Sequence, residues 1–271
     1  MSLPVQLTVG LPMYRTKHIG WLALEALARQ VDIDFSWELI VAEEQEELML
    51  GEEAIRACES RLREAGCTRV EYIPVQSWIS LSQKWLLLAR HASATSEVFA
   101  FQAADAYCHP HRLRTSFDLT LGQYDWSQSK KMLMYSVKSG KVILLDRGVR
   151  ASWGYHNCGD NMAVKTVLAR KLPKADCRTG VDNWLYRRCQ EIKGSKLNVI
   201  WDESTNWKAG FHTKGLNNIS DYAGKFETVQ APFQETGIDL KDTIPAEILV
   251  RLGQLQALAA QWEVQPWSGR K

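Results

Sequence analysis

The chain has 271 residues, of which 45% are apolar and 24% charged, a composition typical of a globular protein with a substantial core. The formal net charge of +2 gives no overall field that would favour nucleic acid or an anionic membrane. No apolar run approaches the roughly 20 residues of a membrane span, and the first residues lack the pattern of a signal peptide. Since the six cysteines show no metal-finger spacing, we expect a cytoplasmic protein with reduced thiols.

Short apolar runs alternate with helical patterns through the first 101 residues. Strands are expected at 5–11, 35–41, 69–75 and 98–101. Apolar residues at helical spacing fill the intervals between them, over 19–30, 46–65 and 81–92. This alternation is typical of right-handed crossovers between parallel strands, so it predicts an α/β protein.

The pattern after residue 101 is less regular. Two apolar runs that flank Ser139-Gly140 predict a hairpin over 132–137 and 141–145. Helices are expected at 112–122, 161–170, 182–192 and 245–262, a strand at 197–201 and a loop at 207–220. The stretch 222–243 is polar and lacks periodicity. We therefore divide the chain into a main domain, 1–222, and a C-terminal extension, 223–271, that ends in a helix.

The acidic residue Asp105 directly follows the apolar run Val98–Phe101. Ligands of open α/β sheets bind at the edge where the parallel strands end, which is where this carboxylate would lie. Hard cations such as Mg²⁺ and Mn²⁺ take oxygen ligands together with substrate phosphates, so Asp105 is a candidate metal ligand. The alternative is an ordinary turn aspartate ahead of Pro110.

Two further residues are candidates for the chemistry. His212, in a glycine-bearing segment that we expect to be a loop, is either an imidazole ligand of Mn²⁺ or a solvated side chain. Asp182, at the start of an expected helix, is either its N-cap or a general base that takes a proton from a hydroxyl group.

Polar residues also follow the first two expected strands. Glu43 and Glu44 could accept hydrogen bonds from a nucleobase or ribose, or begin a solvated acidic helix. Tyr14 could stack on a base or pack on the first helix, and Arg15 and Lys84 are either phosphate partners or surface charge. Neither GxGxxG nor GxxxxGK[ST] occurs, which argues against dinucleotide and P-loop chemistry.

Several of these segments are similar to motifs of one known family. They are Thr8–Arg15, Glu38–Glu44, Phe99–Ala106, Pro110–Leu113 and Gly180–Leu185. Over roughly residues 5–220 the chain resembles family 2 glycosyltransferases of the GT-A fold. The resemblance implies a Rossmann-like mixed sheet flanked by helices within 1–222, followed by the C-terminal helical extension.

The resemblance also implies roles for single residues. Pro12 and Ala104 join Tyr14, Arg15, Glu43, Glu44 and Lys84 as donor-binding positions, and Asp182 corresponds to the catalytic base. Ala103 stands where the family's Asp-x-Asp motif has its first aspartate. The resemblance therefore pairs Asp105 with the distant His212 as ligands of Mn²⁺ or Mg²⁺.

The function that the resemblance implies is inverting, metal-assisted transfer of a sugar from a nucleoside-diphosphate sugar, with UDP as the expected nucleotide. The expected acceptor is a glycan. A hydroxymethylated base of DNA is the alternative acceptor, because Lys and Arg residues are interleaved with Trp in several places. Two other interpretations are a non-catalytic nucleotide- or sugar-binding protein on the same fold and a nucleotidyltransferase. The oligomeric state is not predicted.

Overall fold

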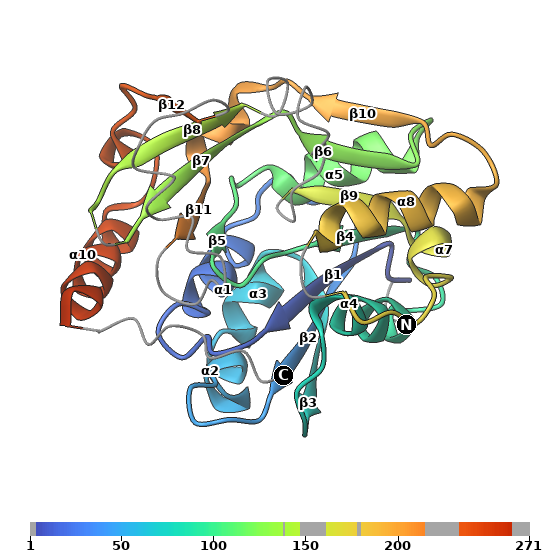
Figure 1. Cartoon of the computed structure of the whole chain (residues 1–271), viewed down its shortest axis with the longest axis horizontal. Coiled ribbons are helices and arrows are strands. Elements are labelled where there is room, and N and C mark those ends of the chain that lie inside the picture. Colours follow the sequence, from blue (N-terminus) through green and yellow to red (C-terminus); the bar gives the residue numbers. More distant parts are fainter. Residues whose placement is uncertain (1–3, 138, 147–160, 178–179, 215–232, 262–271) are drawn as a thin grey trace.

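A computed structural model describes residues 4–137, 139–146, 161–177, 180–214 and 233–261, and shows a mixed α/β fold (Figure 1). Its larger sheet has the strand order β10-β6-β9-β4-β1-β2-β3. These strands are β1 (Leu7–Met13), β2 (Trp37–Glu44), β3 (Cys67–Val75), β4 (Val98–Phe101), β6 (Trp126–Ser129), β9 (Met162–Lys165) and β10 (Val199–Asp202). All are parallel except β9, so the carboxyl ends of the other six strands lie at one edge of the sheet. The predicted mixed sheet flanked by helices is confirmed.

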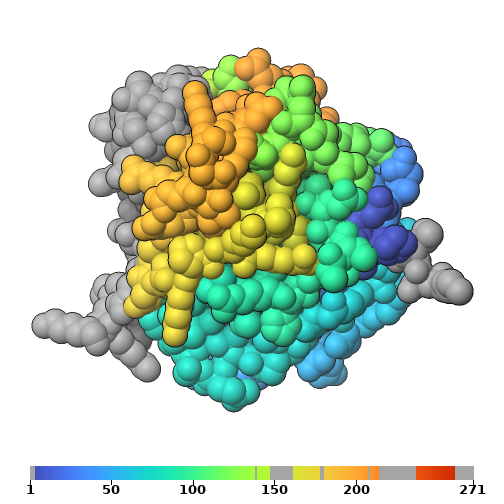
Figure 2. All heavy atoms as spheres, turned by 90° about the vertical axis from the view of Figure 1, so that its right-hand side faces the viewer, coloured from blue at the N-terminus to red at the C-terminus, as the bar shows by residue number. Residues whose placement is uncertain are grey.

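Helices cover both faces of this sheet because the strands bury alternate residues on opposite sides. They are α1 (Trp21–Leu27), α2 (Glu52–Ala57), α3 (Glu59–Glu64), α4 (Leu81–His91), α5 (Arg112–Leu121), α7 (Thr166–Ala169) and α8 (Val181–Lys193). One core cluster joins α1, α3 and α5 to residues such as Val9 and Leu39. The other joins α4, α7 and α8 to residues such as Ile40 and Phe99. In Figure 2, α7 and α8 (yellow) lie over α4 (teal), and these three helices contact one another.

A smaller sheet lies beside the larger one, with the strand order β12-β8-β7-β11-β5. Its strands are β5 (Ala106–Tyr107), β7 (Lys131–Ser136), β8 (Val142–Asp146), β11 (Phe211–Lys214) and β12 (Phe233–Glu235). The antiparallel pair β7 and β8 is the predicted hairpin. Because β12 pairs with β8, residues of the C-terminal extension complete this sheet.

The C-terminal helix α10 (Ala246–Gln261) packs back on the rest of the chain. Its residues Ile248 and Leu252 share a core cluster with Leu22 of α1 and with strands of the smaller sheet. The guanidinium of Arg251 lies 3.8 Å from the ring centre of Trp21, which places a cation over an aromatic face at the same junction. The domain boundary expected between 222 and 223 lies outside the described residues, so it stays a prediction.

Three element predictions are wrong. Residues 161–170 form β9 and the short α7 rather than one helix, and β9 lies antiparallel between β4 and β6. The helix expected from 46 begins only at Glu52, because the preceding loop donates its backbone N–H groups to a buried carboxylate described below. The loop expected at 207–220 contains the 3-10 helix η2 (Thr205–Ala209) and β11. Among the described residues, no helix is long and apolar enough to cross a membrane.

Candidate functional site

Asp105 and His212 lie together at the carboxyl end of β4. Asp105 is in the turn that joins β4 to β5, and His212 lies on β11, opposite Ala106 of β5. The distance between His212 Nε2 and Asp105 Oδ1 is 2.8 Å, and the two side chains keep 15% and 9% of their surface exposed. Thr213 holds the turn in place by donating both its N–H and its hydroxyl to the Asp105 carbonyl oxygen. The fold therefore joins two candidate residues that are more than a hundred positions apart.

Gly210 makes this approach of the two segments possible. A Cβ atom at this position would lie 2.8 Å from the Tyr107 carbonyl oxygen and 2.9 Å from the His109 nitrogen. Carbon atoms do not approach backbone atoms so closely, so any other residue would push β11 away from β5. The glycine before β11 thus determines how near His212 comes to Asp105.

The two side chains suit part of a metal site. Neighbouring ligands of an octahedral Mg²⁺ or Mn²⁺ ion, with bonds of about 2.1 Å, lie about 3.0 Å apart, which is close to the spacing of His212 Nε2 and Asp105 Oδ1. Within the described parts of the chain, no group of three or more His, Cys, Asp and Glu side chains could hold a metal ion. The pair would therefore depend on water and substrate oxygens for the remaining positions, as Mg²⁺ sites on phosphates commonly do.

Lys84 and Glu44 form a buried ion pair at the ends of β1 and β2. Lys84 Nζ lies 2.6 Å from Glu44 Oε1, donates to the Met13 carbonyl oxygen at 3.1 Å, and lies 5.1 Å from the ring centre of Tyr14. Burial lowers the pKa of Lys84, and Glu44 opposes that shift. Because both charges are already engaged and almost fully buried, we assign the pair to tying α4 to the sheet instead of to phosphate or ribose contacts.

Both carboxylate oxygens of Glu43 accept hydrogen bonds from donors of the same chain. Its Oε1 accepts from Thr16 Oγ1 and the Leu50 N–H, and its Oε2 accepts from the Gly51 N–H and the Tyr72 hydroxyl. A carboxylate has about four acceptor positions, so none remains for a nucleotide, and the side chain is fully buried. The expected contact of Glu43 with base or ribose is therefore replaced by a structural role in the loop before α2.

Arg15 remains an accessible cation at this edge. Its side chain is 47% exposed and its backbone has a φ of 55°, an uncommon conformation for a residue other than glycine. Backbone strain of this kind is concentrated at functional sites. Pro12 is buried in β1, where it pairs with Ala42, and Ala104 is buried in the turn before Asp105. These two residues would shape a site through their backbone.

Asp182 is the second residue of α8 and not its N-cap. The cap position belongs to Gly180, which has the left-handed conformation that favours glycine. The segment before α8 is tied to α4, because Ser82 Oγ accepts from the Cys177 N–H and donates to the Ala175 carbonyl oxygen. A carboxylate in the first turn of a helix is stabilised by the helix dipole. The role of Asp182 as a base stays a prediction.

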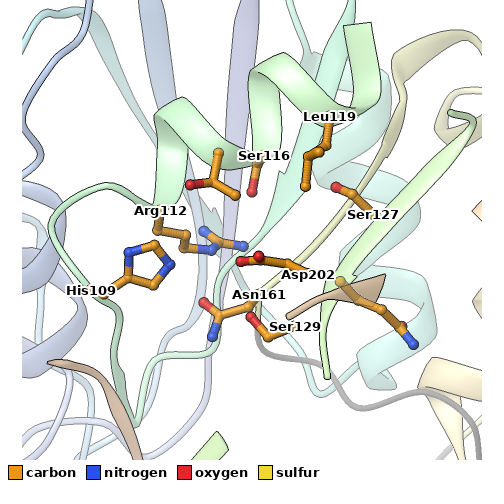
Figure 3. A pocket seen from close by; sticks show the side chains of 10 residues that line it. His109, Arg112, Ser116, Leu119, Ser127, Ser129, Asn161 and Asp202 are labelled. Atoms are coloured by element: carbon orange, nitrogen blue, oxygen red, sulfur yellow. The ribbon is translucent and has the colours of Figure 1, made fainter. Parts of the chain in front are cut away.

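The sequence did not point to a polar pocket at the ends of β6 and β10. Figure 3 shows His109, Arg112, Asn161, Ser129 and Asp202 around it, and its volume of about 10 Å³ is room for about one water molecule. His109 is buried, its Nδ1 has no hydrogen-bond partner, and burial lowers its pKa to about 3. Arg112 donates to the carbonyl oxygens of Phe101 and Met162 and so joins β4 to β9. Only tertiary contacts define this pocket, because its lining comes from four separate segments.

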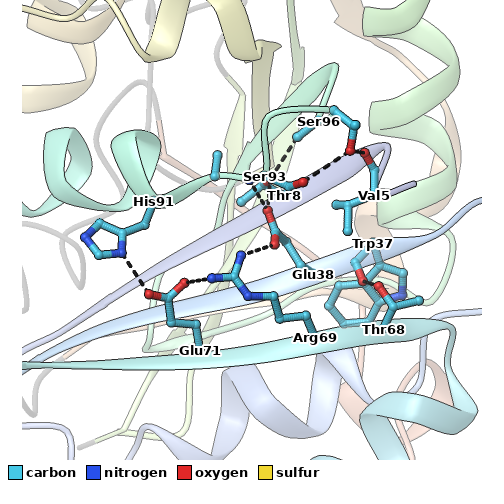
Figure 4. Close-up of polar contacts among 12 residues, drawn as sticks. Val5, Thr8, Trp37, Glu38, Thr68, Arg69, Glu71, His91, Ser93 and Ser96 are labelled. Carbon is cyan, nitrogen blue, oxygen red and sulfur yellow. Dashed lines mark hydrogen bonds and ion pairs between the residues drawn. The ribbon is translucent and has the colours of Figure 1, made fainter. Parts of the chain in front are cut away.

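A second polar cluster lies at the opposite edge of the same sheet (Figure 4). Glu38, near the start of β2, is fully buried. Its Oε1 accepts from Thr8 Oγ1 at 2.7 Å and from the Ser93 N–H at 2.6 Å, and its Oε2 accepts from Arg69 at 2.9 Å. Arg69 also pairs with Glu71. The carboxylate is thus satisfied within the chain, and this cluster is structural.

The fold is shared with solved structures of nucleotide-sugar proteins. TarS of S. aureus has a TM-score of 0.56 and 12% identity over 78% of this chain, and its complex with UDP-GlcNAc has 0.54 and 13% over 78%. The mannosyltransferase PcManGT of Pyrobaculum calidifontis, in complex with GDP-Man and Mn²⁺, has 0.51 and 12% over 95% of this chain and 74% of its own.

These likenesses establish the fold alone. This chain spans 37% of the TarS chain in the first of these structures and 59% in the UDP-GlcNAc complex. No protein-family model and no curated protein matches the chain. The function must therefore be argued from the site.

Proposed function

We propose that this protein is a glycosyltransferase that moves a sugar from a nucleoside-diphosphate sugar to an acceptor hydroxyl group, with inversion at the anomeric carbon. The observation that carries the proposal is the Asp105–His212 pair, a carboxylate and an imidazole 2.8 Å apart at the carboxyl end of β4, with 9% of the Asp105 side chain and 15% of the His212 side chain exposed. Ligands of open α/β sheets bind at this edge. The shared fold supports the proposal, since TarS was solved with UDP-GlcNAc and PcManGT with GDP-Man and Mn²⁺.

Asp105 Oδ1 and His212 Nε2 would hold a Mn²⁺ or Mg²⁺ ion on the diphosphate of the donor. When bound, such an ion stabilises the negative charge of the leaving diphosphate as a Lewis acid. Arg15 is the exposed cation of this edge and would bind a phosphate oxygen. Tyr14, between Arg15 and Lys84, would line the nucleoside. A UDP-sugar is the proposed donor.

Asp182 would act as the general base. As the acceptor oxygen bonds to the anomeric carbon, the bond from that carbon to the diphosphate oxygen breaks, the electron pair leaves with the diphosphate, and the hydroxyl proton passes to the Asp182 carboxylate. General-base assistance is worth about 10²–10⁴-fold in rate. The proposed acceptor is a glycan, with a hydroxymethylated nucleic-acid base as the alternative.

The test compares Asp182→Asn with Asp176→Asn, which changes an exposed carboxylate six residues earlier. With a panel of UDP-sugars, Mn²⁺ and candidate acceptors, we expect Asp182→Asn to keep the donor affinity of the wild type and to lose about 10²-fold or more of its transfer rate. Asp176→Asn should keep both. Normal transfer by Asp182→Asn would refute the base assignment, and a wild type that neither binds nor turns over any nucleotide sugar would refute the proposal.

A second candidate function is non-catalytic binding of a nucleotide sugar. Ala103 favours it, because the chain has an apolar residue where the resembled motif has a metal-binding carboxylate. The two candidates differ in one measurement, the slow hydrolysis of a UDP-sugar in the presence of Mn²⁺. Hydrolysis that disappears in Asp105→Ala would exclude the binding protein, whereas tight donor binding without any turnover would favour it.

A further inference from the structure

A second and larger pocket lies where the C-terminal helix α10 packs on the smaller sheet. Its volume is about 380 Å³, which is within the range of small-molecule sites. Tyr107, Pro110 and Ala209 form part of its wall. Residues 241–245, which lead from the 3-10 helix η3 (Leu240–Asp242) into α10, form another part. The pocket therefore exists only because the C-terminal segment folds back on the rest of the chain.

The pocket lies behind the strands that carry the Asp105–His212 pair. Phe211 of β11 is opposite Tyr107 of β5, and their rings stack with the centroids 5.8 Å apart. Both rings belong to the core cluster that contains residues of α1 and α10. Successive side chains of a strand point to opposite faces, so the imidazole of His212 lies on the other face of β11. The pocket and the imidazole are thus separated by the two strands.

Two polar residues of the lining have unused hydrogen-bonding capacity. An arginine carries five N–H donors, but within the described residues only Nη2 of Arg29 is engaged, by Glu25 and Glu247. Arg29 Nε is buried and has no hydrogen-bond partner. In the described part of the chain the hydroxyl of the buried Tyr107 makes no hydrogen bond either. Burial raises the pKa of Tyr107, so the hydroxyl stays protonated and can both donate and accept.

The charges around the pocket are balanced, which indicates an uncharged ligand. Arg29 Nη2 pairs with Glu247 at 2.9 Å. Lys241 Nζ pairs with Asp239 at 2.8 Å, and the carboxylate of Asp242 also belongs to the lining. An anion would face these carboxylates and a cation would face the two basic groups. A neutral ligand avoids both costs, and hydroxyl groups can satisfy donors and acceptors at once.

Much of the remaining lining is apolar, and its residues are Pro110, Ala209, Ile244 and Pro245. Small-molecule sites commonly combine apolar walls with a few polar groups that fix the orientation of the ligand. A sugar ring presents C–H groups beside its hydroxyl groups, so it matches a wall of this mixed kind.

We infer that this pocket is a second ligand site, which binds a small neutral saccharide through hydrogen bonds to Arg29 and the Tyr107 hydroxyl and through contacts of its C–H groups with the apolar wall. The site goes beyond the proposed function, because it lies on the opposite face of β11 from His212 and requires neither metal nor nucleotide. The C-terminal segment has a role here beyond packing, since it supplies part of the binding surface.

The test measures saccharide binding to the whole chain by titration calorimetry, without metal or nucleotide. The probes are glucose, mannose, galactose, N-acetylglucosamine and maltose, with glucuronate as the anionic counterpart of glucose. We expect at least one neutral saccharide to bind, and glucuronate to bind more weakly than glucose. Tyr107→Phe should weaken binding by about three- to tenfold, the usual effect of one hydrogen bond. Ala209→Phe should abolish binding, because its ring would fill the pocket.

Two matched controls separate the pocket from general effects of the substitutions. Tyr135→Phe removes the hydroxyl of another buried tyrosine in the same core cluster, and Ala54→Phe enlarges a half-buried alanine on α2. Neither residue lines the pocket, so both variants should bind as the wild type does. Tyr107→Phe should also melt at the temperature of the wild type. A marked fall would show that the chain itself uses the Tyr107 hydroxyl, and would overturn its role in binding.

Three other outcomes would overturn the inference. If no saccharide binds the wild type, the pocket is not a saccharide site. If a saccharide binds the wild type, Tyr107→Phe and Ala209→Phe equally well, it binds elsewhere on the protein. If glucuronate binds more tightly than glucose, the site selects an anion. Because metal and nucleotide are absent from this experiment, each of these outcomes leaves the proposed function standing.

Discussion

The two edges of the larger sheet both carry buried carboxylates, but their partners differ. At the starts of the strands, Glu38 is fully buried and accepts from Thr8, Ser93 and Arg69 of its own chain. At the ends of the strands, Asp105 is also buried, but it faces the imidazole of His212 across two segments, and its side chain keeps 9% of its surface exposed whereas that of Glu38 keeps none. We therefore expect the Glu38 cluster to stabilise the fold and the Asp105–His212 pair to contact a ligand.

Among the substitutions that test this difference between the two edges, the largest expected effect is on catalysis. Asp105→Ala should lower sugar transfer or UDP-sugar hydrolysis by about 10²–10³-fold, the usual cost of removing one group that stabilises charge in a transition state. Because Asp105 is buried against His212, the melting temperature of the variant should fall as well, so activity is compared at a temperature at which the variant is folded. Asp118→Ala, which removes an exposed carboxylate on α5, is the control and should change neither quantity. Full activity of Asp105→Ala would remove Asp105 from the mechanism.

Glu38→Ala should produce the opposite result. We expect a loss of about 3 kcal/mol in the free energy of unfolding, because the buried Thr8 Oγ1 and the partly buried Ser93 N–H lose their acceptor. Nucleotide affinity of the folded protein should not change. Glu71→Ala, at the exposed end of the same network, should cost less than about 1 kcal/mol. Urea denaturation of both variants measures the difference in the free energy of unfolding. Equal losses in Glu38→Ala and Glu71→Ala would contradict the distinction between the buried and the exposed part of this network.

Gly210→Ala tests the same comparison in another way. It strains the edge where the strands end and leaves Asp105 and His212 unchanged. Its Cβ would lie 2.8 Å from the Tyr107 carbonyl oxygen, so β11 must shift, at a cost of about 1–3 kcal/mol. The shift moves His212 relative to Asp105, so the affinity for Mn²⁺ in the presence of UDP should fall as well. Gly237→Ala, where a Cβ meets nothing within 4 Å, is the control. Unchanged Mn²⁺ affinity in a destabilised Gly210→Ala would show that the pair tolerates displacement.

His109 should have the smallest effect at neutral pH, because its contribution to stability changes only on acidification. Burial lowers its pKa to about 3, whereas in the unfolded chain the pKa is about 6.5. Between these values the unfolded state binds the extra proton, so stability falls as the pH decreases from about 6.5, by up to about 1.4 kcal/mol per pH unit. His109→Gln should flatten this dependence, whereas His111→Gln, which changes an exposed histidine, should not. If stability changes with pH equally steeply in the wild type and in His109→Gln, another group causes the loss of stability at acidic pH.

The sequence predicts the first half of the fold well because its signals are local. Runs such as Val98–Phe101 are short and bounded by polar residues, and each became a strand of the larger sheet. The segment 162–165 is also short, but nothing within it distinguishes a strand from the first turn of a helix. It became β9 because the exposed edges of β4 and β6 offered hydrogen bonds on both sides. Those partners are distant in the sequence.

The residues of the candidate site also differ in how far local sequence signals describe them. Asp105 stands out in the sequence because an apolar run that ends at a carboxylate is contained in one segment, and its role stays a prediction. Glu43 and Glu44 stand out for the same reason, and Lys84 as a candidate phosphate partner, yet neighbours in space engage all three within the chain.

The sequence by itself determined the class of fold and the strand that leads to Asp105, because periodicity and strand ends depend on residues close together in the chain. Only the tertiary structure decided which side chains face each carboxylate. A hydrogen-bond donor that closes Glu38 or Glu43 comes from another strand or loop, and so does the imidazole that faces Asp105. Burial and partnership are properties of the folded chain, since both depend on residues that only folding brings together.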